Sequence, residues 1–126
     1  MRIIVLALFL AALAVAVPYA VQTPAQNLNI PFDFVVGNKS YPAGQYEVNH
    51  ANMDVPAVTL RSGKTVIDAI VITWLARPET DLTMVKLVFD KVGDKRILSE
   101  VWMPGQEGLL IHAQKGKHEH EIVTGQ

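Results

Sequence analysis

The chain has 126 residues, of which half are hydrophobic, and its 11 basic and 12 acidic side chains give a net charge of −1. This length accommodates one domain of ordinary size. The balanced charge, without a basic patch, argues against a nucleic-acid partner. Because the chain has no cysteine, disulfides and a lipid anchor on cysteine are excluded, and we expect a domain stabilised by its apolar core alone.

The N-terminus has the pattern of a signal peptide. Arg2 supplies a positive charge, Ile3–Val17 is an uninterrupted apolar run, and small residues follow up to Ala25. This order is what signal peptidase requires. We expect cleavage after Ala25 or, as an alternative, after Ala20.

An uncleaved membrane anchor is the other interpretation of this segment. The apolar run is short for a membrane span, which needs roughly 20 residues. The sequence therefore predicts a secreted or periplasmic protein, with a signal peptide helix at 1–25 and a single domain at 26–126. Contact with a membrane would occur only through an uncleaved leader. Removal of the leader takes away one arginine and no acidic residue, which leaves a net charge of −2.

The domain begins with two predicted strands. Large apolar side chains occupy every second position from Leu28 to Val36, which places them on one face of a strand. Pro31 lacks a backbone N–H, so we expect this strand at a sheet edge or with a bulge. After turns rich in glycine and proline, Gln45–His50 is the second strand.

The next two predicted strands form a hairpin. Ala57–Arg61 is joined by a tight turn at Ser62-Gly63 to the longest strand, Thr65–Leu75. Apolar residues on both faces of Thr65–Leu75 indicate a central strand that is covered on both sides. Its many β-branched residues argue against a buried helix.

Two further hairpins complete the predicted domain. Thr83–Val92 and Lys95–Met103 are closed by Gly93-Asp94, and Leu109–Ala113 and His118–Thr124 form the last hairpin. Short strands with turn signals at this spacing are typical of sandwiches and small barrels. We therefore predict an all-β fold: a sandwich or flattened barrel of seven or eight mostly antiparallel strands.

Four stretches of the domain resemble one family. Asn29–Lys39 and Pro42–Val48 are similar to the opening of small exported proteins common in acidobacterial genomes. Lys86–Trp102 and Lys115–His120 resemble the second half of the same family. The family has no assigned function, so the resemblance implies a secreted β domain and no catalytic residue.

The C-terminal histidines are the candidate metal ligands. His118 and His120 are two residues apart, so on a strand they point to the same side. A three-residue turn in the last hairpin would place His112 opposite His120, whereas a two-residue turn would place it on the other face. Three converging imidazoles could bind Zn²⁺, Cu²⁺ or Ni²⁺. The alternative is a solvated terminal strand in which His and Glu form cross-strand charge pairs.

Other motifs support no catalysis. Trp74 and Trp102 are candidates for a sugar-stacking surface, with burial in the core or at its rim as the alternative. Asp68 interrupts an apolar strand, and we expect it to be solvated or paired with a loop amide. Arg61–Thr65 resembles the end of a phosphate-binding loop, but position 58 is Val where that motif needs Gly, so a hairpin turn is expected.

We therefore expect an exported, non-enzymatic module with a binding or structural role at the cell envelope. Its partner would be an envelope protein or a polysaccharide, and no cofactor is required. A periplasmic transition-metal-binding protein using His112, His118 and His120 is the alternative. A carbohydrate-binding module using Trp74 and Trp102 is the second alternative.

Overall fold

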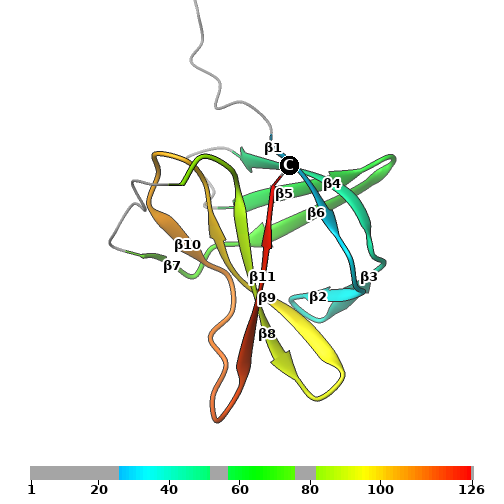
Figure 1. Cartoon of the computed structure of the whole chain (residues 1–126), viewed down its shortest axis with the longest axis vertical. Coiled ribbons are helices and arrows are strands. Elements are labelled where there is room, and N and C mark those ends of the chain that lie inside the picture. The colour runs from blue at the N-terminus through cyan, green and yellow to red at the C-terminus, as the bar shows by residue number, and fades with distance from the viewer. Residues whose placement is uncertain (1–25, 52–56, 76–81, 126) are drawn as a thin grey trace, which may run out of the picture.

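The computed structural model describes residues 26–51, 57–75 and 82–125, and the leader with its expected cleavage sites lies outside them. The predicted all-β sandwich is confirmed: the described residues form two mostly antiparallel sheets (Figure 1). No helix in this part of the chain is long and apolar enough to cross a membrane. The strands are β1 (Gln26–Ile30), β2 (Phe34–Val36), β3 (Lys39–Tyr41), β4 (Gly44–Ala51), β5 (Ala57–Ser62), β6 (Thr65–Ile70), β7 (Thr73–Leu75), β8 (Lys86–Val92), β9 (Lys95–Trp102), β10 (Gly108–Leu110) and β11 (Glu119–Thr124).

The first sheet has the strand order β1-β4-β5-β6 and is antiparallel throughout. Its two-residue β5–β6 turn is Gly63-Lys64, one residue later than predicted, because Ser62 pairs with Thr65. Gly63 has a φ of 58°, which suits the first loop position of a hairpin turn and is costly for residues with a Cβ. The segment that resembles a phosphate-binding loop is therefore a hairpin turn, as expected.

The second sheet has the order β11-β8-β9-β10-β7. The β2–β3 hairpin joins it through a parallel pairing of Val35 with Ile97 in β9. The predicted β8–β9 hairpin is confirmed, with its turn at Gly93-Asp94. A bulge leaves Ser99 without a paired residue on β8, since Val88 pairs with Glu100 and Phe89 with Leu98.

The core lies between the sheets and includes Leu28, Ile30, Phe34 and Val36, the alternating positions that were predicted to share one face. Burying each such large side chain contributes about 1.5–3 kcal/mol. Phe34 packs against three other rings there, with centroids 5.2 Å from Tyr46, 5.7 Å from Phe89 and 5.9 Å from Tyr41. The largest fully buried side chains are Phe34, Phe89, Leu28, Ile30, Leu60, Ile67, Leu87, Leu98, Leu109, Val48, Val58 and Val85.

The predicted strand from Leu28 to Val36 is broken after Ile30, and its halves lie in different sheets. The break begins at Pro31, which has no N–H to donate to a ladder. The first half, β1, is an edge strand, as Pro31 indicated. This break, a second one in Thr65–Leu75 and the short β3 account for eleven strands where seven or eight were predicted.

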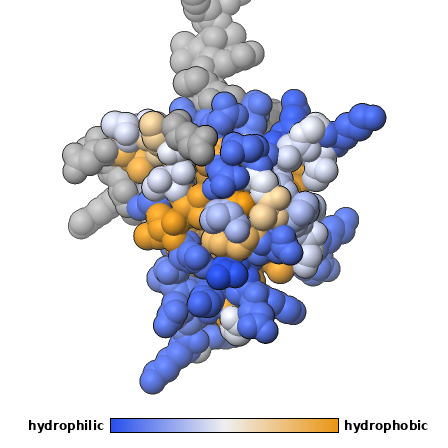
Figure 2. Space-filling view, turned by 45° about the vertical axis from the view of Figure 1, so that its right-hand side comes forward, coloured by the Kyte–Doolittle hydropathy of each residue, from blue (hydrophilic) through white to orange (hydrophobic). Residues whose placement is uncertain are grey.

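The expectation that Thr65–Leu75 is a central strand is wrong. The segment is divided at Val71-Ile72 into β6 and β7, and each is the last strand of its sheet. One side of the segment is exposed, with Val66, Ile70 and Ile72 between 52% and 69% accessible. The apolar residues on both faces thus reflect an uncovered apolar surface and not burial on both sides. Figure 2 shows apolar atoms gathered in the middle of one face of the molecule, among hydrophilic ones.

The expected hairpin of Leu109–Ala113 with His118–Thr124 is also wrong. β10 pairs with β9 and β7, whereas β11 pairs with β8. β8 and β9 therefore lie between β10 and β11 in the sheet. The chain leaves β10, runs to the end of the molecule at the bottom of Figure 1 and returns there as β11.

Candidate metal centre

The pairing of β11 with β8 brings two histidines to an aspartate. His120 is directly opposite Asp90 in the ladder, so the two side chains point to the same face. His118 immediately precedes β11 and lies two residues before His120. Strand alternation carries it to the same side.

The three side chains lie close enough to share one ion. His120 Nδ1 is 3.0 Å from Asp90 Oδ1, and His118 Nε2 is 3.5 Å from the same oxygen. The two imidazole centroids are 4.9 Å apart and the rings are nearly perpendicular, at 87°. One potential ligand atom from each of Asp90, His118 and His120 lies within 4.8 Å of the other two.

Asp90 is the unusual member of this group because its carboxylate is buried without hydrogen bonds. The residue is 1% exposed, and neither oxygen has a hydrogen-bond partner in the part of the chain that the structure describes. The approaches of the two imidazoles are close, but they do not have hydrogen-bond geometry. A buried charge in this condition costs several kcal/mol unless a cation compensates it.

A hydrogen bond of His118 indicates which of its two ring nitrogens carries the proton. Its Nδ1 is 2.9 Å from the carbonyl oxygen of Gly116. A carbonyl can only accept, so Nδ1 carries the proton, and in the neutral ring Nε2 presents its lone pair. Nε2 itself is 3.5 Å from Asp90 Oδ1. A backbone carbonyl that fixes the outer nitrogen in this way is the usual support of a metal-ligating histidine.

The two nitrogen–oxygen distances suit a metal ion, whereas the two nitrogens, up to 4.8 Å apart, must move closer when one ion binds both. Ligand atoms bonded at about 2.0–2.1 Å to a tetrahedral Zn²⁺ lie about 3.3 Å apart. The two nitrogen–oxygen distances of 3.0 and 3.5 Å lie on either side of that value. Two imidazoles with one carboxylate form a donor set that suits zinc, copper and nickel.

His112, the third predicted ligand, does not belong to this group. The β9 bulge holds its backbone, because Ser99 accepts the His112 N–H at 3.1 Å and its hydroxyl donates to the His112 carbonyl at 2.8 Å. The ring nitrogen Nε2 lies 2.9 Å from Gln114 Oε1. Since Leu109–Ala113 does not pair with β11, neither of the two considered registers occurs, and Asp90 takes the place expected for His112.

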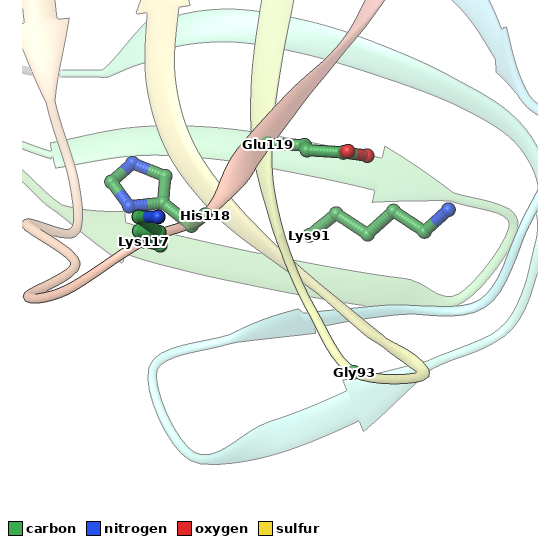
Figure 3. Close-up of a pocket in the computed structure, with 5 residues that line it drawn as sticks. All are labelled: Lys91, Gly93, Lys117, His118 and Glu119. Carbon is green, nitrogen blue, oxygen red and sulfur yellow. The ribbon is translucent and has the colours of Figure 1, made fainter.

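A surface hollow of about 500 Å³ adjoins one member of the group. Its lining residues are Lys91, Gly93, Lys117, His118 and Glu119. Lys91 and Glu119 are paired across the ladder, and they extend away from the His118 ring (Figure 3). Of the three candidate ligands, only His118 reaches this hollow.

The two tryptophans do not form a common surface. Trp74 pairs with Leu109, which pairs with Val101, so Trp74 shares the face of Val101. Trp102 follows Val101 directly and therefore points to the other face of the sheet. There its indole N–H donates to Glu100 at 3.0 Å and its ring contacts Lys86.

Asp68 also has an ordinary role. It is exposed and accepts a hydrogen bond from the Thr59 hydroxyl at 3.2 Å, across the β5–β6 ladder.

The residue that the sequence analysis missed is Asp90. It follows the buried run Leu87–Phe89 within the predicted strand Thr83–Val92, and an acidic residue in that position was the available signal.

No protein-family model matches the chain, and no curated protein or solved structure is significantly similar to it. The resemblance to small exported acidobacterial proteins therefore stays a prediction.

Proposed function

We propose that this chain is an exported, non-enzymatic protein that binds a divalent transition metal through Asp90, His118 and His120. The observation that carries the proposal is the Asp90 carboxylate. It is buried and lacks hydrogen bonds within the described residues, while two imidazole nitrogens stand 3.0 and 3.5 Å away. A cation between the three groups would compensate the buried charge and occupy both nitrogen lone pairs.

The donor set indicates the class of metal. Imidazole nitrogen suits Zn²⁺, Cu²⁺ and Ni²⁺, whereas Mg²⁺ and Ca²⁺ prefer shells made of oxygen ligands. The two histidines therefore favour the first three ions over the abundant hard cations. Three protein ligands leave at least one coordination position for water or another ligand, unlike a closed four-ligand structural site.

The exported location is the second part of the proposal. It is supported by the basic start, apolar run and small residues of positions 1–25. A metal site made from histidine and aspartate needs no reduced thiol, so it remains functional in an oxidising compartment.

Metal titration tests the proposal. The purified protein, freed of metal with a chelator, is titrated with Zn²⁺, Cu²⁺ and Ni²⁺ by calorimetry and melted at each metal concentration. Binding to the native state at a hundredfold excess over Kd should raise stability by about 2.7 kcal/mol. Mg²⁺ is the matched control and should produce no shift.

Either of two results would refute the metal-binding proposal. If none of the three transition metals binds or raises the melting temperature, the group is a structural charge cluster and not a metal site. Binding that persists when Asp90, His118 and His120 are all replaced would place the metal elsewhere and would also refute this assignment.

A further inference from the structure

A second feature of the molecule is independent of the metal centre: a groove beside the edge strand β6 that contains a row of exposed apolar residues. Val66, Ile70 and Ile72 are 52%, 69% and 63% exposed, although all three are large hydrophobic residues. They line one side of a hollow of about 500 Å³, which Val36, Tyr41 and Ile111 also line. Contiguous apolar surface at a strand edge marks a place where another chain binds.

Both walls of this groove are strand edges. β6 is the last strand of the first sheet, and β3 pairs only with β2. Within the described residues, each wall thus has one side without a neighbouring strand. Such edges offer backbone N–H and C=O groups to a further strand.

The walls carry opposite charges. Lys39 stands on the β3 wall and Asp68 on the β6 wall, both line the hollow and both are exposed. Neither has a salt-bridge partner among the described residues. A partner that fits this groove must therefore present an anion to Lys39 and a cation to Asp68, together with apolar surface between them.

A second copy of the groove meets these requirements. A twofold axis parallel to the groove exchanges its two walls, so the β6 wall of one copy faces the β3 wall of the other. The arrangement requires each Asp68 to lie opposite Lys39 of the other copy, twice in the complex. The exposed row of Val66, Ile70 and Ile72 in each copy is covered at the same time.

We propose that the protein forms a twofold-symmetric homodimer through this groove, with β6 of each subunit along β3 of the other. Twofold dimers are the commonest closed assemblies, and their interfaces must be complementary to themselves. The pairing of an apolar row with one charge of each sign on opposite walls satisfies that condition.

A charge exchange tests the arrangement. The molar mass of the purified protein is measured by light scattering and sedimentation over a wide concentration range, with chelator present so that metal cannot bridge two copies. Lys39→Glu and Asp68→Lys each place like charges across the interface and should weaken dimerisation at least tenfold. The double variant, with both charges exchanged, should restore the dimer.

Two apolar variants complete the test. Ile70→Lys should give a folded monomer, because a charge replaces the centre of the apolar row. Ile122→Lys is the matched control, since Ile122 is 58% exposed on β11, outside the groove, and it should leave the dimer intact. Circular dichroism confirms that each variant is folded. A protein that is monomeric at every concentration, or a dimer that survives Ile70→Lys, would overturn the proposal.

Discussion

His120 stands directly opposite Asp90 in the β11–β8 ladder, with Nδ1 3.0 Å from Oδ1 of a carboxylate that is 1% exposed. The pairing is between residues 30 positions apart in the chain, so the sheet register alone creates it. Because His118 adds a second nitrogen on the same side, the register assembles three potential metal ligands at one point.

The first prediction concerns the charge of Asp90. Without metal, Asp90→Asn should be as stable as the wild type or more stable, because an amide of the same shape removes a buried charge that lacks hydrogen bonds. With metal, the same variant should lose most of the stabilisation of about 2.7 kcal/mol expected at a hundredfold excess over Kd. Urea unfolding with chelator and with Zn²⁺ measures both quantities.

A loss of stability in the metal-free Asp90→Asn variant would contradict this prediction. A metal-free Asp90→Asn variant that is less stable than the wild type by more than about 1 kcal/mol would show that protonated imidazoles already compensate the carboxylate. The cluster would then be an ion-pair network that needs no metal.

The second prediction compares His118, an assigned metal ligand, with His112, which lies outside the metal centre. His118→Gln should reduce Zn²⁺ affinity at least tenfold, because it removes a ligand whose outer nitrogen is fixed by the Gly116 carbonyl. His112→Gln is the control and should leave the affinity within a factor of two, since His112 is held at the β9 bulge. Calorimetric titration compares both variants with the wild type. Equal losses in the two variants would contradict the assigned ligand set.

Local patterns predicted the parts of the fold that depend on neighbouring residues. Alternation identified the inward-facing residues Leu28, Ile30, Phe34 and Val36 of β1 and β2, and Gly93-Asp94 identified the β8–β9 hairpin. Period-2 patterns report which side chains share a face, and a glycine turn reports that adjacent strands pair. Neither signal depends on contacts between distant segments.

The pairing of β11 could not be obtained in this way. Alternation in Glu119–Thr124 is compatible with any partner strand, and the nearest strand in sequence, Leu109–Ala113, was the natural choice. The structure instead uses β8, which changes the third ligand from His112 to Asp90. His118 and His120 were identifiable because their relation is local, whereas Asp90 is brought to them only by the sheet order.

The exposed row on β6 shows a different limit of sequence analysis. Apolar residues on both faces of Thr65–Leu75 are typical of a strand with cover on both sides. A strand that packs on the core with one face and binds another chain with the other has the same composition. Periodicity cannot separate cover by the same domain from cover by a partner, so the interpretation needed the sheet order.

The third prediction concerns Gly108 beneath the ring of Trp102. A Cβ added at Gly108 would lie 2.6 Å from the indole, which is too close for any real contact. Gly108→Ala should therefore displace the ring and destabilise the domain by about 1–3 kcal/mol. In a Trp102→Ala background the same substitution should cost much less, because the obstructing ring is gone. A double-mutant cycle by urea unfolding measures the coupling, and additive effects would show that the two residues do not interact.

The fourth prediction is a pH dependence of stability that comes from Tyr46. Its side chain is 3% exposed and its hydroxyl donates to the Pro42 carbonyl at 2.7 Å. Burial, followed by the nearby Asp33 carboxylate and Tyr41, raises the pKa of Tyr46 above its ordinary value of 10.0. The folded protein thus favours the neutral phenol. This contribution to stability is fully present below pH 10.0 and is lost as the pH rises through the folded pKa.

Tyr46→Phe isolates this effect. At neutral pH it should cost about 1 kcal/mol, through loss of the hydrogen bond to Pro42. Above pH 10.0 the difference from the wild type should shrink, because the variant has no phenol to ionise. Urea unfolding from neutral to alkaline pH measures the two stabilities, and phenolate absorption follows the titration itself. A stability difference that stays constant through the alkaline range would mean that Tyr46 ionises alike in the folded and unfolded chains, and the assigned cause would be wrong.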